Sequence, residues 1–135
     1  MEDQLRCLAC VRSHLTPGAR FAFDVFNPRP ERLTADEEPE TPDLRFAQDG
    51  EEIVRYARVW RDRARQRLRV AFRYQRSAGG RVIGNAHAEI TMRWFHRYEL
   101  LHLMHRAGFA EVAIHGDFDG SPVSRESPAF VVVAR

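Results

Sequence analysis

Two pairs of side chains have spacings that occur in metal and redox sites. Cys7 and Cys10 form a C-x-x-C pair, and His102 and His105 lie three positions apart. A redox pair of this kind opens a helix that follows a strand, whereas the cysteines fall inside a helical pattern with no strand before it. A zinc site needs further ligands, and neither pair has them. We interpret the cysteines as small residues on a helix and predict no metal site.

Nine arginines lie between Arg55 and Arg76, with aromatic residues among them. Such a stripe can bind RNA or single-stranded DNA, because guanidinium groups contact phosphates and aromatic rings stack on bases. It is also typical of a solvated antiparallel sheet, where arginines pair with acids on neighbouring strands. The net charge is only +2 and no nucleic-acid-binding motif is present. We therefore favour the solvated sheet over nucleic-acid binding.

The length and composition indicate one globular domain over residues 1–135. Hydrophobic residues make up 44% of the chain, which is enough for a core. No apolar run approaches the roughly 18 residues of a membrane span, and the first residues lack the features of a signal peptide. We expect a cytoplasmic protein with no membrane partner.

Residues 1–28 predict a helix followed by a strand. The helix, at about 2–15, ends at Thr16-Pro17-Gly18, because proline cannot continue a helix and glycine permits a left-handed turn. Residues 20–26 read Arg-Phe-Ala-Phe-Asp-Val-Phe, a nearly continuous apolar run that is typical of a parallel strand covered on both faces.

Residues 29–50 contain several prolines and an acidic run at 36–40, and they predict a surface loop. This loop is either a solvated acidic segment or a lid over a substrate site, because such loops line the ligand crevice of open α/β sheets. Residues 51–93 predict three antiparallel strands with one apolar and one charged face. The strands span about Ile53–Trp60, Leu68–Arg76 and Val82–Met92.

Residues 94–135 predict a helix followed by a strand hairpin. A helical apolar stripe runs over about 97–106, and Gly108 suits the position that follows a helix. Two short apolar strands come after it, at 112–115 and 129–134.

Together these segments resemble the second half of a class I S-adenosylmethionine-dependent methyltransferase that acts on small molecules. The resemblance is carried by Leu15-Thr-Pro-Gly18, by Phe23-Asp-Val-Phe-Asn-Pro28, and by the family's E-L-x-x-L-x-x-x-A-G-F pattern at 99–109. The family usually has a glycine where Ala19 stands. The resemblance implies an α/β fold: a partial Rossmann-like sheet with the fifth strand, the last helix and a C-terminal antiparallel hairpin, plus an inserted three-stranded antiparallel sheet.

The family's cofactor, S-adenosylmethionine, is held by a glycine-rich loop between a first strand and a helix, with an acidic residue at the end of the second strand. This sequence has no such pattern. We therefore expect a C-terminal portion of a methyltransferase, truncated or completed by another chain, that does not bind the cofactor alone. No catalytic or cofactor-binding residue is assigned.

Five residues are candidates for contacts with a small-molecule substrate. Asp24 and Asn27 lie at or near the carboxyl end of the central strand, where active sites of the family open. Trp94, His96 and Arg97 lie where the inserted sheet meets the last helix. Each also has a structural interpretation: Asn27 in a turn, His96 at the start of the helix, and Trp94 as a core anchor.

The strand at 20–26 would lack one neighbour of the parent fold, which leaves an open edge of unpaired backbone groups. This predicts a homodimer or larger assembly through that strand, the first helix or the inserted sheet. The alternatives are a non-enzymatic dimeric or partner-binding module derived from the same fold and, less favoured, a nucleic-acid binder.

Overall fold

The computed structural model describes residues 2–135, which divide into two compact units. The mixed unit comprises Met1–Arg29 and Trp94–Arg135, and the sheet unit comprises Pro30–Arg93. We expected one domain, whereas the inserted strands form a unit of their own. Within the described part of the chain, no helix is long and apolar enough to cross a membrane.

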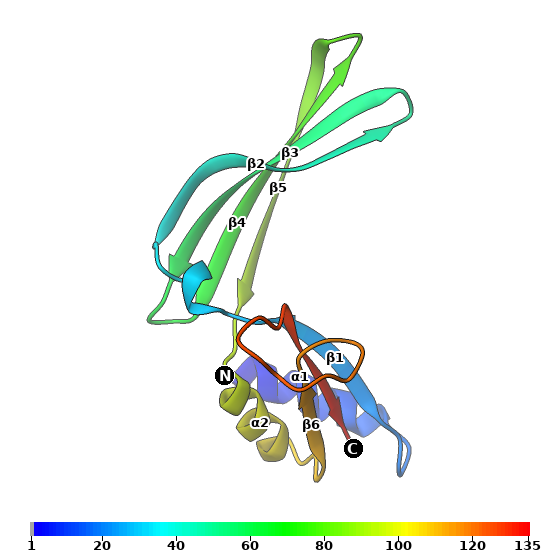
Figure 1. Ribbon diagram of the computed structural model, residues 1–135. Helices are drawn as coiled ribbons and strands as arrows, with labels where there is room; N and C mark the ends of the chain where they lie inside the picture. The colour runs from blue at the N-terminus through cyan, green and yellow to red at the C-terminus, as the bar shows by residue number, and fades with distance from the viewer. Residues whose placement is uncertain (1) are drawn as a thin grey trace. The chain divides into compact units, whose positions relative to one another are not determined.

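The mixed unit contains two helices and three strands (Figure 1). In chain order they are α1 (Glu2–His14), β1 (Phe21–Phe26), α2 (Arg97–Arg106), β6 (Val112–His115) and β7 (Ala129–Ala134). The strand order is β1-β7-β6, with both pairings antiparallel. The antiparallel pairing of β6 with β7 confirms the expected C-terminal hairpin, and β7 also lies beside β1. On its other edge β1 has no partner strand among residues 2–135.

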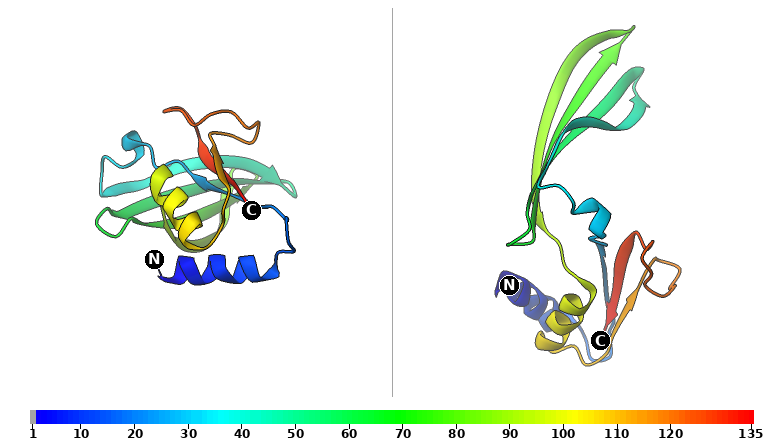
Figure 2. Two further views of the ribbon diagram at one scale, coloured as in Figure 1. Left: turned by 90° about the horizontal axis from the view of Figure 1, so that it is seen from below. Right: turned by 60° about the vertical axis from the view of Figure 1, so that its left-hand side comes forward.

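The core of the mixed unit lies between the helices and one face of this sheet (Figure 2). Alternation along β7 turns Phe130, Val132 and Ala134 toward this core. They pack with Leu8 of α1 and with the buried stripe of α2, whose Met104 is 0% exposed. The predicted helical stripe at 97–106 is thus confirmed as the main apolar surface of α2.

Gly108 ends α2 as predicted. Its φ is +93°, a left-handed conformation that costs other residues energy. A Cβ at this position would also meet the guanidinium group of Arg12, which reaches across from α1. Two separate effects therefore require glycine here.

We expect Gly108→Asn to destabilise the mixed unit by roughly 1–2 kcal/mol and Gly108→Val by more, because a β-branched residue tolerates positive φ least. Urea unfolding measures both. In an Arg12→Ala background the steric contribution disappears, so both costs should fall while their order stays the same. Equal stability of the Asn and Val variants would contradict the strained-turn assignment.

The sheet unit is an antiparallel meander with a short 3-10 helix at Pro30–Arg32 (Figure 1). Its strands are β2 (Glu37–Gln48), β3 (Glu51–Asp62), β4 (Arg67–Ala78) and β5 (Arg81–Arg93), in that order. The three predicted strands are β3, β4 and β5. Register places Val59, Val70 and Ile90 in one row, so an apolar face forms as the alternation predicted.

The prediction of a loop over 29–50 is wrong for most of its length. Residues Glu37–Gln48 form β2, and the inserted sheet has four strands rather than three. Prolines are tolerated because β2 is an edge strand, with its register interrupted at Glu38/Thr41 and again at Pro42/Leu44. The turn that follows uses Asp49 and Gly50, both with positive φ. That Asp-Gly pair is a strong hairpin signal in the sequence.

Candidate functional site

The carboxyl end of β1 carries two of the predicted substrate residues. Asn27 is buried, its Nδ2 donates a hydrogen bond to the Ser127 carbonyl at 3.0 Å, and its backbone N–H donates to Pro128 at 3.1 Å. It therefore fastens the end of β1 to the segment that leads into β7. Asp24 is exposed on β1 opposite Val131, on the sheet face away from the core. Its carboxylate is free of the core and can meet a ligand.

The other three predicted residues lie at the start of α2. Trp94 is 2% exposed, as expected of a core anchor. His96 is the exposed N-cap, with φ −89° and ψ 156°, and its backbone N–H donates to Glu99 Oε2 at 3.3 Å. The Arg97 guanidinium carbon lies 5.7 Å from the Tyr98 ring centroid. The Asn27 N–H groups donate to residues 127 and 128, whereas the backbone N–H of His96 donates within α2.

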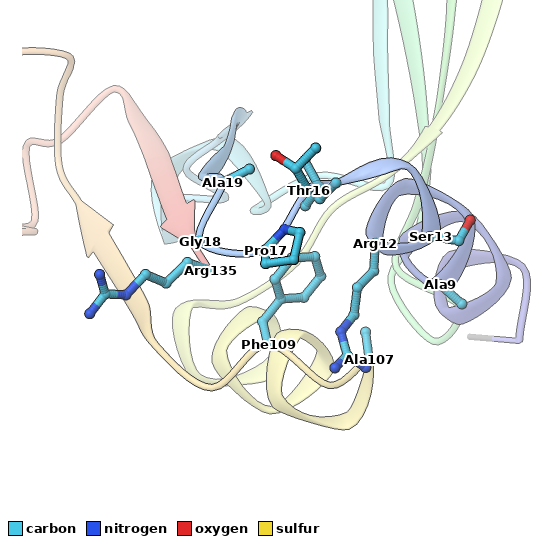
Figure 3. Close-up of a pocket in the computed structure, with 11 residues that line it drawn as sticks. Ala9, Arg12, Ser13, Thr16, Pro17, Gly18, Ala19, Ala107, Phe109 and Arg135 are labelled. Carbon is cyan, nitrogen blue, oxygen red and sulfur yellow. The ribbon is translucent and has the colours of Figure 1, made fainter.

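A pocket of about 550 Å³ lies at the opposite, amino-terminal end of β1 (Figure 3). It is lined by the last turn of α1, the turn at 15–19, and Ala107, Phe109 and Arg135. Pro17 and Phe109 both line it, and the Arg12 side chain extends toward Ala107 (Figure 3). None of the five predicted residues lines it. The sequence pointed to a turn at 16–18 but gave no sign of a pocket there.

A second pocket, of about 470 Å³, lies over β6 and β7. Arg20, Glu111, His115 and Arg135 supply its polar lining. Arg135 Nη2 donates to Glu111 Oε1 at 2.5 Å, and this hydrogen bond lowers the pKa of the Glu111 carboxyl below its ordinary value. A carboxylate held ionised by an exposed ion pair is a poor general base.

The arginines of β3 and β4 are paired with acids. Eight of the nine arginines between Arg55 and Arg76 make ion pairs, with Asp36, Glu37, Glu38, Glu40, Asp43, Glu51, Asp62 and Glu89. Hydrogen bonds from Arg73 lower the pKa of the Glu40 carboxyl, so this partner is ionised at neutral pH. Phosphates would have to displace these carboxylates, which argues against nucleic-acid binding.

Arginine side chains also cover two aromatic rings of this sheet. The guanidinium carbons of Arg69 and Arg58 lie 3.9 Å and 4.8 Å from the Trp60 ring centroid, and that of Arg73 lies 4.0 Å from the Tyr56 ring centroid. Cation–π contacts of this kind contribute to packing across the strands. They leave these ring faces covered by side chains of the same sheet.

Two features of residues 2–135 bear on metal and cofactor binding. Among residues 2–135, no three His, Cys, Asp or Glu side chains are grouped so that they could hold a metal ion. Gly18 follows a helix and precedes a strand, Gly50 and Gly79-Gly80 lie in hairpin turns, and Gly116 and Gly120 flank a loop. Within this described range, no glycine-rich turn joins a strand to a helix, so the residues do not fit the family's cofactor loop.

No profile of a known protein family matches the sequence, and no curated protein matches it. Solved structures do. The CcbJ methyltransferase from Streptomyces caelestis matches 99% of the chain with a TM-score of 0.75 and 24% identity. An S-adenosylmethionine-dependent methyltransferase from Clostridium acetobutylicum matches 99% with a TM-score of 0.73 and 11% identity. CalS10, an amino pentose methyltransferase from Micromonospora echinaspora, matches 97% with a TM-score of 0.66 and 20% identity.

The chain covers 53%, 51% and 50% of these three proteins, so it spans about half the length of the structures that it matches. It therefore has the fold of part of an S-adenosylmethionine-dependent methyltransferase. This confirms the resemblance noted in the sequence.

Proposed function

We propose that this chain is the C-terminal part of an S-adenosylmethionine-dependent methyltransferase of small molecules, and that a separate unit holds the cofactor. The observation that carries the proposal is the match of nearly the whole chain to about half of each of several such enzymes. The open edge of β1 supports it, because a parallel strand of the missing unit would pair there.

In this assignment the chain supplies the acceptor side of the site. Asp24, His96 and Arg97 are exposed polar groups that can bind an acceptor, while Asn27 and Trp94 position the backbone around them. CalS10 is an amino pentose methyltransferase, and an amino sugar is therefore the first acceptor class to test. Methyl transfer requires the sulfonium and the acceptor to be held in line, so the cofactor unit is indispensable.

The alternative is a non-enzymatic homodimer or partner-binding module built from the same fold. The observation that favours it is also the open β1 edge, since a second copy could pair there as well as a cofactor unit. The pairing of the arginines with acids leaves no comparable support for nucleic-acid binding.

Calorimetry with S-adenosylmethionine and S-adenosylhomocysteine tests the cofactor claim. We expect no binding by the isolated chain, because it lacks the glycine loop. A dissociation constant of micromolar order, about −8 kcal/mol, would contradict the assignment. Adding a cofactor unit encoded beside this chain should restore cofactor binding and methyl transfer to an amino sugar. Failure of this chain to associate with the cofactor unit would favour the non-enzymatic module.

A further inference from the structure

Strand β2 buries little apolar surface against the rest of the sheet. All twelve of its residues are exposed, including Leu44 at 43% and Phe46 at 38%. The inner strands β3 and β4 each have a buried valine, Val54 and Val70, whereas the other edge strand, β5, is mostly exposed as β2 is. The pairing of β5 with β4 shifts register once, and that of β2 with β3 shifts twice. Because the free energy of apolar burial scales with the area removed from water, it contributes little to holding β2 in place.

The backbone ladder of β2 is also incomplete. Pro39 and Pro42 have no N–H to donate, and the pairing with β3 shifts register between Glu38 and Thr41 and again between Pro42 and Leu44. The ladder is therefore interrupted twice within one strand. An edge strand with these features needs another source of attachment.

Ion pairs supply that attachment. All four acids of β2 have an arginine partner on β3 or β4: Glu37–Arg58, Glu38–Arg61, Glu40–Arg73 and Asp43–Arg55. The Asp43 pair is bidentate, at 2.9 Å and 2.8 Å. Arg61 also donates to the Ala35 carbonyl at 3.1 Å, and its side chain is only 8% exposed. This arginine fixes the point where β2 begins.

We propose that β2 is a detachable edge strand, held to β3 by ion pairs and released at high ionic strength while β3, β4 and β5 stay paired. Salt screens charges that lie at the surface, and the Debye length falls to about 3 Å at 1 M. A segment with little buried apolar surface can open without unfolding the rest. Release of β2 uncovers the edge of β3, whose N–H and C=O groups then become available to another strand. This inference goes beyond the proposed function and does not depend on it.

Hydrogen–deuterium exchange of the full chain tests the proposal, with peptides that cover β2 (37–48) and β4 (67–78). Between about 50 mM and 1 M NaCl we expect exchange in β2 to accelerate about tenfold, and exchange in β4 to change by less than about twofold. Rates are normalised to the unfolded chain at each salt concentration, which removes the direct effect of salt on exchange chemistry.

A charge-removal variant and a matched control identify the cause. Glu37→Gln/Glu40→Gln/Asp43→Asn keeps side-chain shape but removes three of the pairs, so β2 should exchange fast at every salt concentration. The control removes three charges from pairs outside β2, through Asp62→Asn/Glu89→Gln/Glu111→Gln. It should behave as the wild type does. Exchange of β2 that ignores salt, or that accelerates together with β4, would overturn the proposal.

Discussion

Replacing Leu103 with Ala should lower the free energy of unfolding of the mixed unit by about 2–5 kcal/mol. Leu103 is buried on α2, beside Met104 and Leu100, in the cluster that also contains Val132 of β7. Removal of three side-chain carbons loses their transfer free energy and leaves a cavity. The surroundings cannot collapse freely, because the cluster around Leu103 includes Val132 of β7, a strand that is paired on both sides.

The measurement needs a reporter that belongs to the mixed unit. The chain has two tryptophans, Trp94 in the mixed unit and Trp60 in the sheet unit. In a Trp60→Phe background, urea unfolding followed by fluorescence reports the surroundings of the buried Trp94. His102→Ala, at an exposed position of the same helix, should change stability by less than about 0.5 kcal/mol. Equal effects of the two substitutions would show that the core is placed wrongly.

Short-range sequence patterns predicted the mixed unit well. The period of α2 is visible in its leucines, and the Ala107-Gly108-Phe109 ending follows from the conformational freedom of glycine. The apolar run at 129–134 has the composition of a buried strand. These features depend on residues that are close in sequence, so a single sequence is enough to reveal them.

The strand β2 could not be predicted in this way. Its prolines and acids are unfavourable for a strand when they are considered alone. The acids are accommodated because the arginines of β3 and β4, 12 to 33 positions away, neutralise them. The prolines are accommodated because β2 lies at the edge of the sheet. Only the Asp49-Gly50 turn announced the hairpin locally. Pairing between distant segments decided the structure, and local propensity carries no information about it.

In the candidate site, too, the features set by nearby residues were predictable and those set by distant residues were not. The predicted elements indicated a core position for Trp94 and the start of a helix for His96, and the structure has both. The sequence could not show that the amide of Asn27 is engaged by Ser127, 100 positions away. The role of the five residues in binding a substrate stays a prediction. Their tests require the cofactor unit, because an acceptor site is complete only with the methyl donor beside it.

The open edge of β1 allows a sharper test of assembly than its sequence alone suggests. The Asn27 N–H donates to the Pro128 carbonyl, on the side where β7 lies. Successive N–H groups of an antiparallel strand alternate between its two edges. The N–H of Val25 therefore points to β7, and that of Asp24 points to the open edge.

If two copies pair through their β1 edges, Asp24→Pro should weaken the dimer by at least about tenfold, because proline removes an outward donor from each copy. The stability of each unit should change little. Asp24→Ala is the matched control, since it removes the charge but keeps the N–H, and it should remain dimeric.

Val25→Pro should instead break the β1–β7 ladder and destabilise the mixed unit by roughly 1–3 kcal/mol, as it leaves a carbonyl of β7 without its donor.

Light scattering at micromolar concentration measures the assembly state, and urea unfolding measures the stability of the same samples. A wild-type chain that is a monodisperse monomer would contradict self-assembly and leave the β1 edge for a cofactor unit. A dimer that survives Asp24→Pro would move the contact to α1 or to the sheet unit. Loss of the dimer in Asp24→Pro but not in Asp24→Ala would assign the dimer contact to backbone pairing at β1. Both variants remove the carboxylate, and only the proline variant also removes the N–H that points to the open edge.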